Sequence, residues 1–423
     1  MATPTPADAD ADGLRPVTLM LPNMAVPSLA VELLPFGLHI TQILLNADGR
    51  SNDVLIGPLD NRTHRDKRGF LNPVVGRYCN RLPVGSFQVE KDGEKGEVKT
   101  IATESPTVSL HGGPSGFDQR IWTRLPPSSS LNFSPRERAR LAALDPDSLA
   151  IFSLTSPAGD QGFPGTLYTE VLFACLTFPR HPIRPSGEID LGQLAIVYRS
   201  RLAPGQEPLA TPVNLTQHWG FNLSASGGAQ SVNAHTLTIR SAGTIDLTPV
   251  FLATGHITPT AKGGPYDHTT GKEIGTNTPQ GGYDEFYVFD KPQAEGQPIH
   301  LPLTAWQEGD LLGEIFAESA REKPVTLYSN ESGIAAEFQT NQPGVQLYTG
   351  EGLDGSGTKK RIHGGAPGGP GYNKRAAAFL EFHEPHAAWL HPWGAKPDAS
   401  TVLSSKEMYH NFTKVIFTYK HDR

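Results

Sequence analysis

The stretch LAIVYR at residues 194–199 decides the fold class of this chain. Leu194, Ile196 and Tyr198 take every second position in it, and Arg199 belongs to the alternate set. Successive side chains of a strand point to opposite faces, so this period of two predicts a half-buried β-strand. The same alternation recurs in KVIFTY at 414–419, and a further strand is expected just before DVLIG at 53–57. Gly, Pro, Asn and Asp separate the strand-like runs, which favours a sandwich or barrel over alternating strands and helices.

The composition agrees with an all-β chain that turns often. The 423 residues include 44 Gly and 37 Pro, which is high for a helical protein. This length allows two ordinary domains or one large β-domain. We expect a disordered head over residues 1–14, which are rich in Ala, Asp and Pro, and a single β-domain over residues 15–423.

Two segments interrupt the strand pattern. SPRE at 134–137 has the form of a capping box with proline at the first helical position, which predicts a short helix in a surface insertion over about residues 124–150. Residues 355–371 are rich in glycine and predict a mobile loop, because the Lys-Ser/Thr that completes a phosphate-binding loop is absent. Whether either segment covers a binding site is left open by the sequence.

Charge and targeting signals limit the partners of the chain. A net charge of −7 argues against a nucleic-acid partner, which needs a clustered basic surface. The N-terminus lacks the features of a signal peptide, and no apolar run is long enough to cross a bilayer. Cys79 and Cys175 are expected to be free thiols. We therefore predict a cytoplasmic protein without a membrane partner, acting as a monomer or homodimer.

Polar residues that could carry chemistry concentrate in five segments. These are GRYCNR at 76–81, LHGG at 110–113 with GFD at 116–118 and Trp122, NLTQHWGFNL at 214–223, GYD at 282–284 with VQLYTG at 345–350, and FLEFH at 379–383. Taken singly, each also has a structural interpretation, because a lone His such as His111 or His218 is more often structural than catalytic. A carboxylate at the end of an apolar run, as at Glu381, is either exposed or functional, because Glu is seldom buried without a partner.

A metal site and a hydrolase site are both disfavoured. His383, His386 and His391 fit no standard zinc spacing, and no cysteine joins them. The sequence also lacks the G-x-S-x-G motif of a serine hydrolase. We predict that no metal and no other cofactor is bound.

Six segments, taken in order, resemble the galactose mutarotase (aldose 1-epimerase) family. They are GRYCNRLPVG at 76–85, LHGG with GFD and Trp122 at 110–122, TPVNLTQHWGFNL at 211–223, GYD at 282–284, QPGVQLYTGEGLDG at 342–355 and FLEFH at 379–383. Any one of them is a weak signal, but their shared order is specific. The resemblance spans about residues 34–419.

The resemblance implies a galactose mutarotase-like β-supersandwich with short helical insertions, an open sugar cleft and no metal or redox cofactor. It implies that Glu381 is the general base and His218 the general acid. The positions that it implies for sugar contact are Asn80, Arg81, His111, Asp284 and Gln346.

These residue types suit ring opening of a cyclic aldose. A base removes the proton of the C1 hydroxyl, an acid protonates the ring oxygen, and the ring recloses after rotation about the C1–C2 bond. Each such group typically contributes about 10²–10⁴-fold. Burial would raise the pKa of Glu381 and the charge of Arg81 would lower it. We also expect Trp122 or Trp219 to stack on an apolar face of the sugar.

Several positions depart from the family pattern. Trp219 follows the expected acid and could narrow the cleft, Glu285 replaces an imidazole, and Phe382 and His383 follow the expected base. The predicted function is interconversion of the α and β anomers of a free aldohexose. Because of these departures, two alternatives stay open: acid–base isomerisation of a different cyclic hemiacetal, or non-catalytic carbohydrate binding on the same fold.

Overall fold

The computed structural model describes residues 12–22, 26–178, 183–206, 209–291, 297–317, 322–391, 393 and 401–420. Most of the predicted N-terminal head, residues 1–11, lies outside these ranges. The end of that head contacts the body of the protein, because the Gly13 carbonyl accepts a hydrogen bond of 2.9 Å from the Phe36 N–H. The division into a head and one β-domain stays a prediction.

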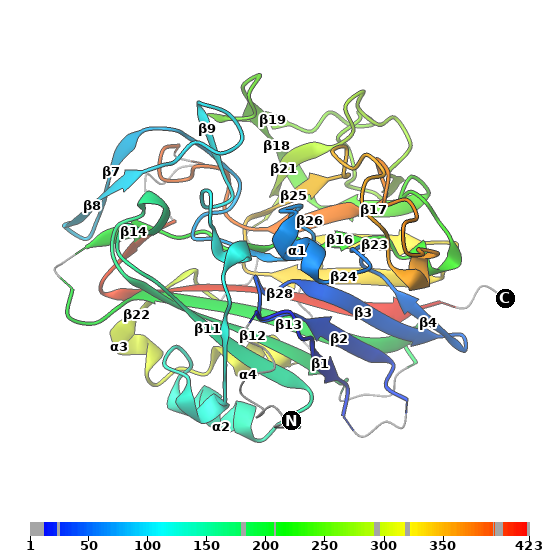
Figure 1. The fold of residues 1–423 in the computed structure, drawn as a ribbon, viewed down its shortest axis with the longest axis horizontal. Coiled ribbons are helices and arrows are strands. Elements are labelled where there is room, and N and C mark those ends of the chain that lie inside the picture. The colour runs from blue at the N-terminus through cyan, green and yellow to red at the C-terminus, as the bar shows by residue number, and fades with distance from the viewer. Residues whose placement is uncertain are drawn as a thin grey trace, which may run out of the picture.

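The predicted all-β fold is confirmed, and a ten-stranded antiparallel sheet forms its centre (Figure 1). Two long strands from distant parts of the sequence, β13 and β28, pair in the middle of this sheet. The strands are β10 (Thr123–Leu125), β11 (Leu149–Ser156), β12 (Leu167–Leu176), β13 (Ile189–Leu202), β28 (Glu407–Tyr419), β24 (Ile334–Thr340), β23 (Val325–Ser329), β17 (His235–Ile239) and β20 (Lys272–Glu273), with β22 (His300–Pro302) beside β28.

Two smaller sheets pack on one face of this central sheet. The six-stranded sheet consists of β16 (Gly220–Phe221), β26 (Ala378–Phe382), β25 (Gly344–Tyr348), β21 (Asp284–Phe289), β18 (Ser241–Leu247) and β19 (Ala253–Pro259). The N-terminal sheet consists of β1 (Val17–Met20), β2 (Leu29–Leu33), β3 (Ile40–Ala47) and β4 (Arg50–Asp53). Apolar side chains of all three sheets form one continuous core.

Short strand pairs and helices complete the fold. The pairs are β5 (Val74–Val75) with β15 (Thr216–Gln217), β6 (Arg81–Pro83) with β9 (Val108–Leu110), β7 (Ser86–Lys91) with β8 (Glu94–Lys99), and β14 (Ala210–Pro212) with β27 (Val402–Ser404). The α-helices are α1 (Arg62–Asp66), α2 (Pro135–Ala142), α3 (Leu303–Trp306) and α4 (Leu311–Phe316). Single 3-10 turns lie at Phe117–Gln119, Pro127–Ser129, Asp160–Gly162, Ala225–Gly227 and Arg361–His363.

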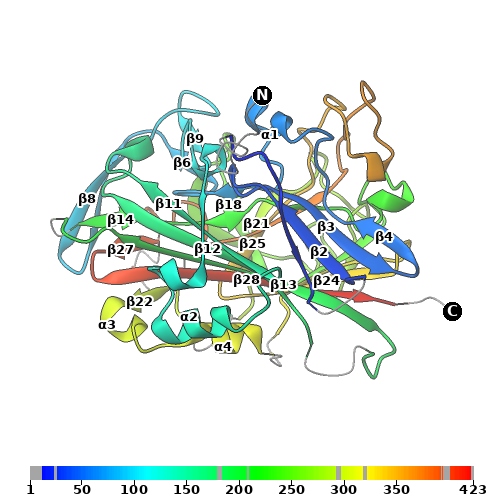
Figure 2. The ribbon, with the colours of Figure 1, turned by 60° about the horizontal axis from the view of Figure 1, so that its bottom comes forward.

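Helices α2, α3 and α4 lie along the outer side of the central sheet (Figure 2). The predicted capping box is present, because Ser134 and Glu137 exchange hydrogen bonds at the start of α2. Glu137 also forms a buried ion pair with Arg199 of β13, at 2.6 Å. The segment from 124 to 150 therefore packs against the sheet and α4, and none of its residues lines the pocket on the six-stranded sheet that is described below.

The helical layer corrects one prediction. The alternation at residues 194–199 predicts a half-buried strand, but β13 is buried on both faces. Arg199, which the pattern places on the solvent side, is fully buried and paired with Glu137. A period of two in the sequence identifies the strand, but the layer that covers its second face comes from residues far away in sequence.

Cys79 and Cys175 are both buried and carry free thiols, as predicted. Within the described ranges, no helix has the length and apolar character needed to span a membrane.

Candidate active site

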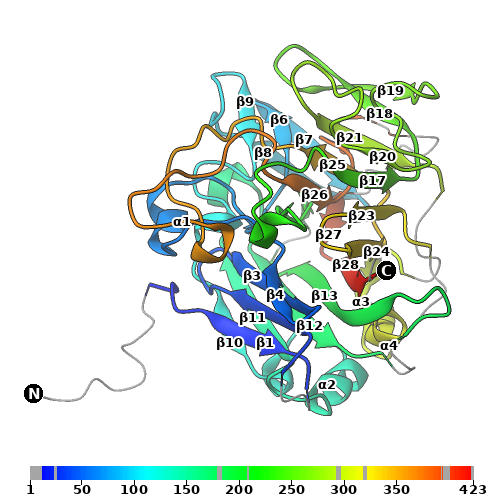
Figure 3. The same cartoon turned by 90° about the vertical axis from the view of Figure 1, so that its right-hand side faces the viewer.

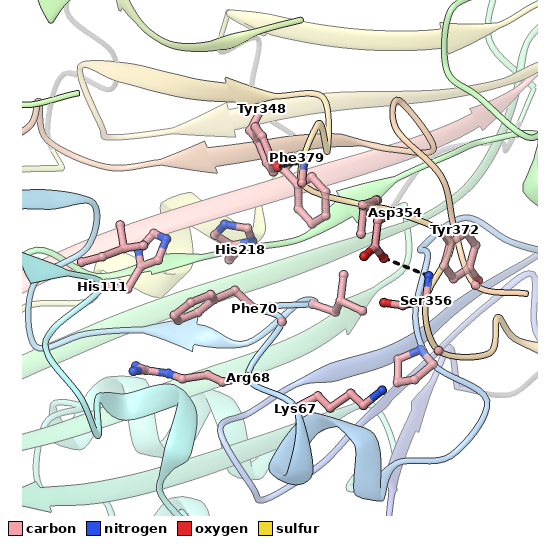
Figure 4. Close-up of a pocket in the computed structure, with 18 of the residues that line it drawn as sticks. Lys67, Arg68, Phe70, His111, His218, Tyr348, Asp354, Ser356, Tyr372 and Phe379 are labelled. Carbon is pink, nitrogen blue, oxygen red and sulfur yellow. Dashed lines mark hydrogen bonds between the residues drawn. The ribbon is translucent and has the colours of Figure 1, made fainter. Parts of the chain in front are cut away.

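A pocket with a volume of about 450 Å³ lies on the outer face of the six-stranded sheet (Figure 4). Its floor comes from β21, β25 and β26, and one wall comes from α1, from the segment between α1 and β5, and from the residues at and around β6 and β9. The opposite wall is the glycine-rich loop that follows β25. All seven residues that the family resemblance implies line this pocket: Asn80, Arg81, His111, His218, Asp284, Gln346 and Glu381.

The register of the six-stranded sheet places the floor residues. Gln346 of β25 lies directly opposite Glu381 of β26, and Tyr348 lies opposite both Phe379 and Asp284. Because side chains alternate between faces, these five residues project from the same face of the sheet. The sequence motifs that contain them are far apart, and strand pairing brings them together.

Glu381 and His218 form the chemical centre of the pocket. The Glu381 Oε1 atom lies 3.3 Å from His218 Nε2, and both side chains are buried. Among the described residues, Glu381 Oε2 has no hydrogen-bond partner. A buried carboxylate oxygen without a partner is costly, so this atom is suited to accept a hydrogen bond from a bound hydroxyl group.

Burial sets the protonation of this pair. It raises the pKa of Glu381 well above its ordinary value, with the negative charge of Asp284 adding to the effect and the cation of Arg81 opposing it. Burial also lowers the pKa of His218 to about 4. Both shifts favour the uncharged forms, which are a protonated carboxyl group and a neutral imidazole.

His111 is held as a hydrogen-bond donor. Its Nδ1 atom accepts the backbone N–H of Asn80 at 3.2 Å, which leaves the proton of the neutral ring on Nε2. Burial and the neighbouring His218 lower the pKa of His111 well below its ordinary value, so the ring stays neutral. Asn80 and His111 both have a positive φ, of 61° and 50°. Backbone strain of this kind concentrates at functional sites.

Ligand atoms of His111, His218 and Glu381 lie within 4.8 Å of one another, a spacing that could hold a metal ion. A metal ligand must present a free lone pair. The Nδ1 lone pair of His111 is already occupied by the Asn80 N–H, so its Nε2 carries the proton. This donor set therefore suits hydrogen bonding to hydroxyl groups better than metal coordination.

Arg81 lies between two carboxylates at one end of the pocket. Its guanidinium donates to Glu104 at 2.7 and 3.0 Å and to Asp284 at 3.3 Å. Burial alone would lower the pKa of Arg81, but these carboxylates outweigh it and raise the pKa. Glu104 also lines the pocket, although no motif in the sequence points to it.

Gln346 is oriented by His386, a buried histidine that does not line the pocket. His386 Nε2 lies 3.0 Å from Gln346 Oε1, and the Gln346 amide group donates to Asp284 Oδ1 at 2.7 Å. The pKa of the His386 ring is lowered well below its ordinary value by burial, so it is neutral and donates from Nε2. The sequence interpretation considered His386 only as a metal ligand and missed this contact.

The prediction that Trp122 or Trp219 stacks on the sugar is wrong. Trp219 is fully buried and packs against Phe338 of the central sheet, while Trp122 packs against Phe117. The Trp219 indole N–H donates to the Leu380 carbonyl at 2.7 Å, and Trp219 does not line the pocket, so it does not narrow it.

Four aromatic rings to which the sequence analysis gave no role in stacking line the pocket instead. They belong to Phe70, Tyr348, Phe379 and Tyr372. The Phe70 ring lies 4.6 Å from His111, and the guanidinium of Arg68 lies over it at 4.7 Å. Arg68 is fixed in turn by two hydrogen bonds to Asp118, which gives the predicted GFD segment a structural role.

The other departures from the family pattern also lie outside the pocket. Glu285 lies beside Asp284 in β21, so its side chain faces away from the floor, and Phe382 packs against Phe338 in the core. His383 is buried against Phe286. None of the three lines the pocket, so they do not alter substrate recognition by contact.

The glycine-rich loop is anchored to the N-terminal sheet. Lys360 donates to Asp53 Oδ2 at 2.7 Å and to the Leu55 carbonyl at 2.8 Å, and all of these atoms are buried. His363 Nε2 lies 2.9 Å from the Asp53 carbonyl oxygen. Figure 3 shows this loop, in orange, beside α1. The loop forms a wall of the pocket through residues that include Ser356, Thr358 and Gly371.

Known proteins resemble this chain in both sequence and fold. The family model described as aldose 1-epimerase matches residues 192–411. The galactose mutarotase of Bos taurus is 29% identical over 354 residues, which cover 84% of this chain and 82% of that protein. The aldose 1-epimerase of Escherichia coli is 30% identical over 240 residues, 56% of each chain.

Two solved structures share the fold. An aldose epimerase homologue from C. elegans superposes with a TM-score of 0.69 at 19% identity, covering 96% of this chain and all of that one. The galactose 1-epimerase of Lactobacillus acidophilus superposes with a TM-score of 0.64 at 16% identity, covering 96% of this chain and 99% of that one. The chain belongs to the aldose 1-epimerase family, whose members are isomerases that interconvert the anomers of aldoses.

Proposed function

We propose that this chain is an aldose 1-epimerase in which Glu381 is the general base and His218 the general acid. The observation that carries the proposal is the buried 3.3 Å contact between Glu381 Oε1 and His218 Nε2 at the floor of the pocket. A hexose that places its C1 hydroxyl and ring oxygen at this pair meets both proton-transfer groups at once. General acid–base groups in hydrogen-bond reach each contribute about 10²–10⁴-fold.

Ring opening moves one proton onto Glu381 and one proton off His218. The carboxylate of Glu381 takes the C1 hydroxyl proton, the imidazolium of His218 protonates the ring oxygen, and the C1–O bond to the ring breaks. After rotation about C1–C2, the aldehyde is attacked on its other face, and both protons return. Nothing is oxidised or reduced, so the two side chains suffice for the proton transfers.

The proton count of the resting pair suits this cycle. A protonated Glu381 beside a neutral His218 holds as many protons as an ionised Glu381 beside a protonated His218. Opening therefore begins with transfer of one proton across the 3.3 Å contact, and it ends in the uncharged arrangement that burial favours. The low dielectric surroundings of the pair make that end state favourable.

The other predicted residues bind the remaining hydroxyl groups in this proposal. His111 donates from Nε2 and Arg81 from its guanidinium, while Asp284 accepts and Gln346 holds Asp284 in place. Asn80 shapes this end of the pocket through its contacts with His111 and Gln346. We further propose that the protein acts in the cytoplasm as a monomer or homodimer, with a free sugar and without a nucleic-acid or membrane partner, which its charge of −7 supports.

The test is polarimetry on freshly dissolved α-D-galactose and α-D-glucose. The expected result is a faster approach to the same final rotation that buffer alone reaches. No acceleration on any common aldose, by protein shown to be folded by circular dichroism, would overturn the proposal.

A further inference from the structure

The pocket continues well past the proposed acid–base pair. We name this continuation the distal compartment, and it is lined by Lys67, Leu71, Asp354, Ser356, Thr358 and Tyr372. Figure 4 shows His111, His218 and Phe70 at one end of the pocket and Asp354, Ser356 and Tyr372 at the other, with Phe379 between them. None of the seven residues carried over from the family resemblance lies in the distal compartment. The whole pocket, at about 450 Å³, falls in the range of roughly 300–1,000 Å³ typical of sites for drug-sized ligands, which are larger than one hexose.

The geometry of a pyranose indicates which part of a sugar would point into this compartment. If the ring oxygen lies at His218, the two carbons bonded to that oxygen are C1 and C5. Arg81, Asp284 and Asn80 gather at one end and are suited to the hydroxyl groups that follow C1. C5 and its C6 group then lie on the other side of His218. There the ring centroids of Phe379 and Phe70 lie 5.0 Å and 6.1 Å from the centroid of the imidazole.

The chemistry of the distal compartment suits a neutral, polar ring. Tyr372 contributes an aromatic ring, and its hydroxyl group is already engaged by His363 Nδ1 at 2.8 Å. Aromatic rings pack on the apolar faces of sugars. At the rim, Lys67 offers an exposed ammonium group and Asp354 an exposed carboxylate, the pKa of which is lowered by hydrogen bonds from Ser356. A phosphate would be attracted by the first group and repelled by the second, whereas sugar hydroxyl groups can bond to both.

The compartment is built before any ligand arrives. Lys360 and His363 fix the loop to Asp53, and the Leu59 N–H donates to the Thr358 carbonyl at 2.9 Å. A wall that is already ordered avoids the entropy cost of ordering on binding.

We propose that the distal compartment binds a second sugar ring joined through the C6 oxygen of the reducing sugar, so that 6-linked reducing disaccharides are the preferred substrates. The inference rests on the proposed epimerase function, because the reducing ring must occupy the acid–base pair. Its probes are isomaltose, glucose, maltose and glucose 6-phosphate, with anomeric exchange at equilibrium measured by NMR magnetisation transfer.

The expected result is a kcat/KM for isomaltose at least about tenfold above that for glucose and for the 4-linked maltose, a gain of about 1.4 kcal/mol. Tyr372→Leu and Lys67→Ala should each lower the ratio of isomaltose to glucose toward one. Lys67 is exposed, so its variant should fold even if Tyr372→Leu does not.

Three other outcomes would overturn the inference. Equal rates on glucose and isomaltose would do so while leaving the proposed epimerase function intact. Faster exchange of glucose 6-phosphate than of isomaltose would mean that the compartment takes an anion. Exchange of no sugar at all would overturn the proposed function and this inference with it.

Discussion

At the scale of single residues, the behaviour of the site depends on how many protons Glu381 and His218 share. Two groups that interact this closely titrate as a pair, and their apparent pKa values belong to both. The uncharged resting state holds one proton that can move between the carboxyl group and the imidazole, across 3.3 Å. Either gain or loss of a proton by the pair removes one of the two catalytic roles.

The proton count predicts a bell-shaped pH profile. As the pH falls toward about 4, the pKa of His218, the pair takes up a second proton while Glu381 is still protonated, and no base is left. As the pH rises through the elevated pKa of Glu381, the pair loses its mobile proton, and no acid is left. The measurement is kcat/KM against pH by polarimetry, with the buffer rate subtracted, since kcat/KM reports the free enzyme. If kcat/KM rose steadily with pH, Glu381 and His218 would not share one mobile proton during catalysis.

His386 is predicted to act as a positioning residue for Gln346. His386→Ala removes the shorter of two hydrogen bonds to Gln346 Oε1, the other coming from the Asn80 amide at 3.3 Å. This change loosens the orientation that directs the Gln346 amide to Asp284, so we expect kcat/KM for galactose to fall about tenfold, mainly through KM. His386→Gln supplies an amide donor in place of the imidazole and should recover most of the loss. If both variants lose activity equally, or if kcat falls with KM unchanged, His386 does not act through Gln346.

The residue scale also shows where sequence reasoning stops. The seven site residues could be named because they lie in motifs that recur in order, and all of them line one pocket. Phe70, Glu104 and Tyr372 also line it, but they lie in segments without a recognisable motif. Trp219 was misplaced because a motif gives the residue type and the backbone decides which way the side chain points.

At the scale of elements, the site depends on one sheet face and one loop. Pairing of β21, β25 and β26 places the side chains of the pocket floor next to one another. The period of two shows which residues of each strand share a face, but it does not show which strands pair. The glycine-rich composition of residues 355–371 predicts a mobile loop. It does not predict that Lys360 and His363 fix this loop to the N-terminal sheet. Those anchors depend on Asp53, about three hundred residues away in sequence.

The loop anchor gives a stability prediction. Lys360→Met leaves the Asp53 carboxylate buried without its cation, and breaking such a pair costs about 3–5 kcal/mol in the free energy of unfolding. The neighbouring Lys359→Met is a matched control, because the Lys359 side chain makes an exposed contact, and it should cost less than about 0.5 kcal/mol. Denaturant unfolding measures both. Equal stability of the two variants would mean that the ion pair does not hold the loop.

At the scale of the whole molecule, the protein has a layer of helices, the central sheet, and smaller sheets that carry the pocket on their outer side. The sequence predicts the all-β class and a short helix that begins after Ser134, because both are encoded in short patterns. It does not reveal that α2 and α4 cover β13. Contacts between distant segments of the chain, such as Glu137 with Arg199, leave no local signal.

The ion pair between the helical layer and the central sheet should matter for stability and not for catalysis. Arg199→Met leaves Glu137 buried without its partner and should lower the free energy of unfolding by about 3–5 kcal/mol. Because the pair faces the helices, kcat/KM of the folded protein should not change. Arg136→Met, on the exposed side of α2, is the control and should be within about 0.5 kcal/mol of the wild type. A drop in kcat/KM of folded Arg199→Met would mean that the layers are coupled to the site.

The measurement that tests the central claim most directly is the rate of galactose mutarotation by Glu381→Gln, His218→Ala and the double variant. Both single variants should lose at least about 10²-fold in kcat, and the double variant should be little slower than the slower single one, since the two residues act as a unit. Glu285→Gln is the matched control, because it makes the same substitution in the same sheet but outside the pocket, and it should keep the wild-type rate. Wild-type catalysis by folded Glu381→Gln would contradict the assignment of the acid–base pair.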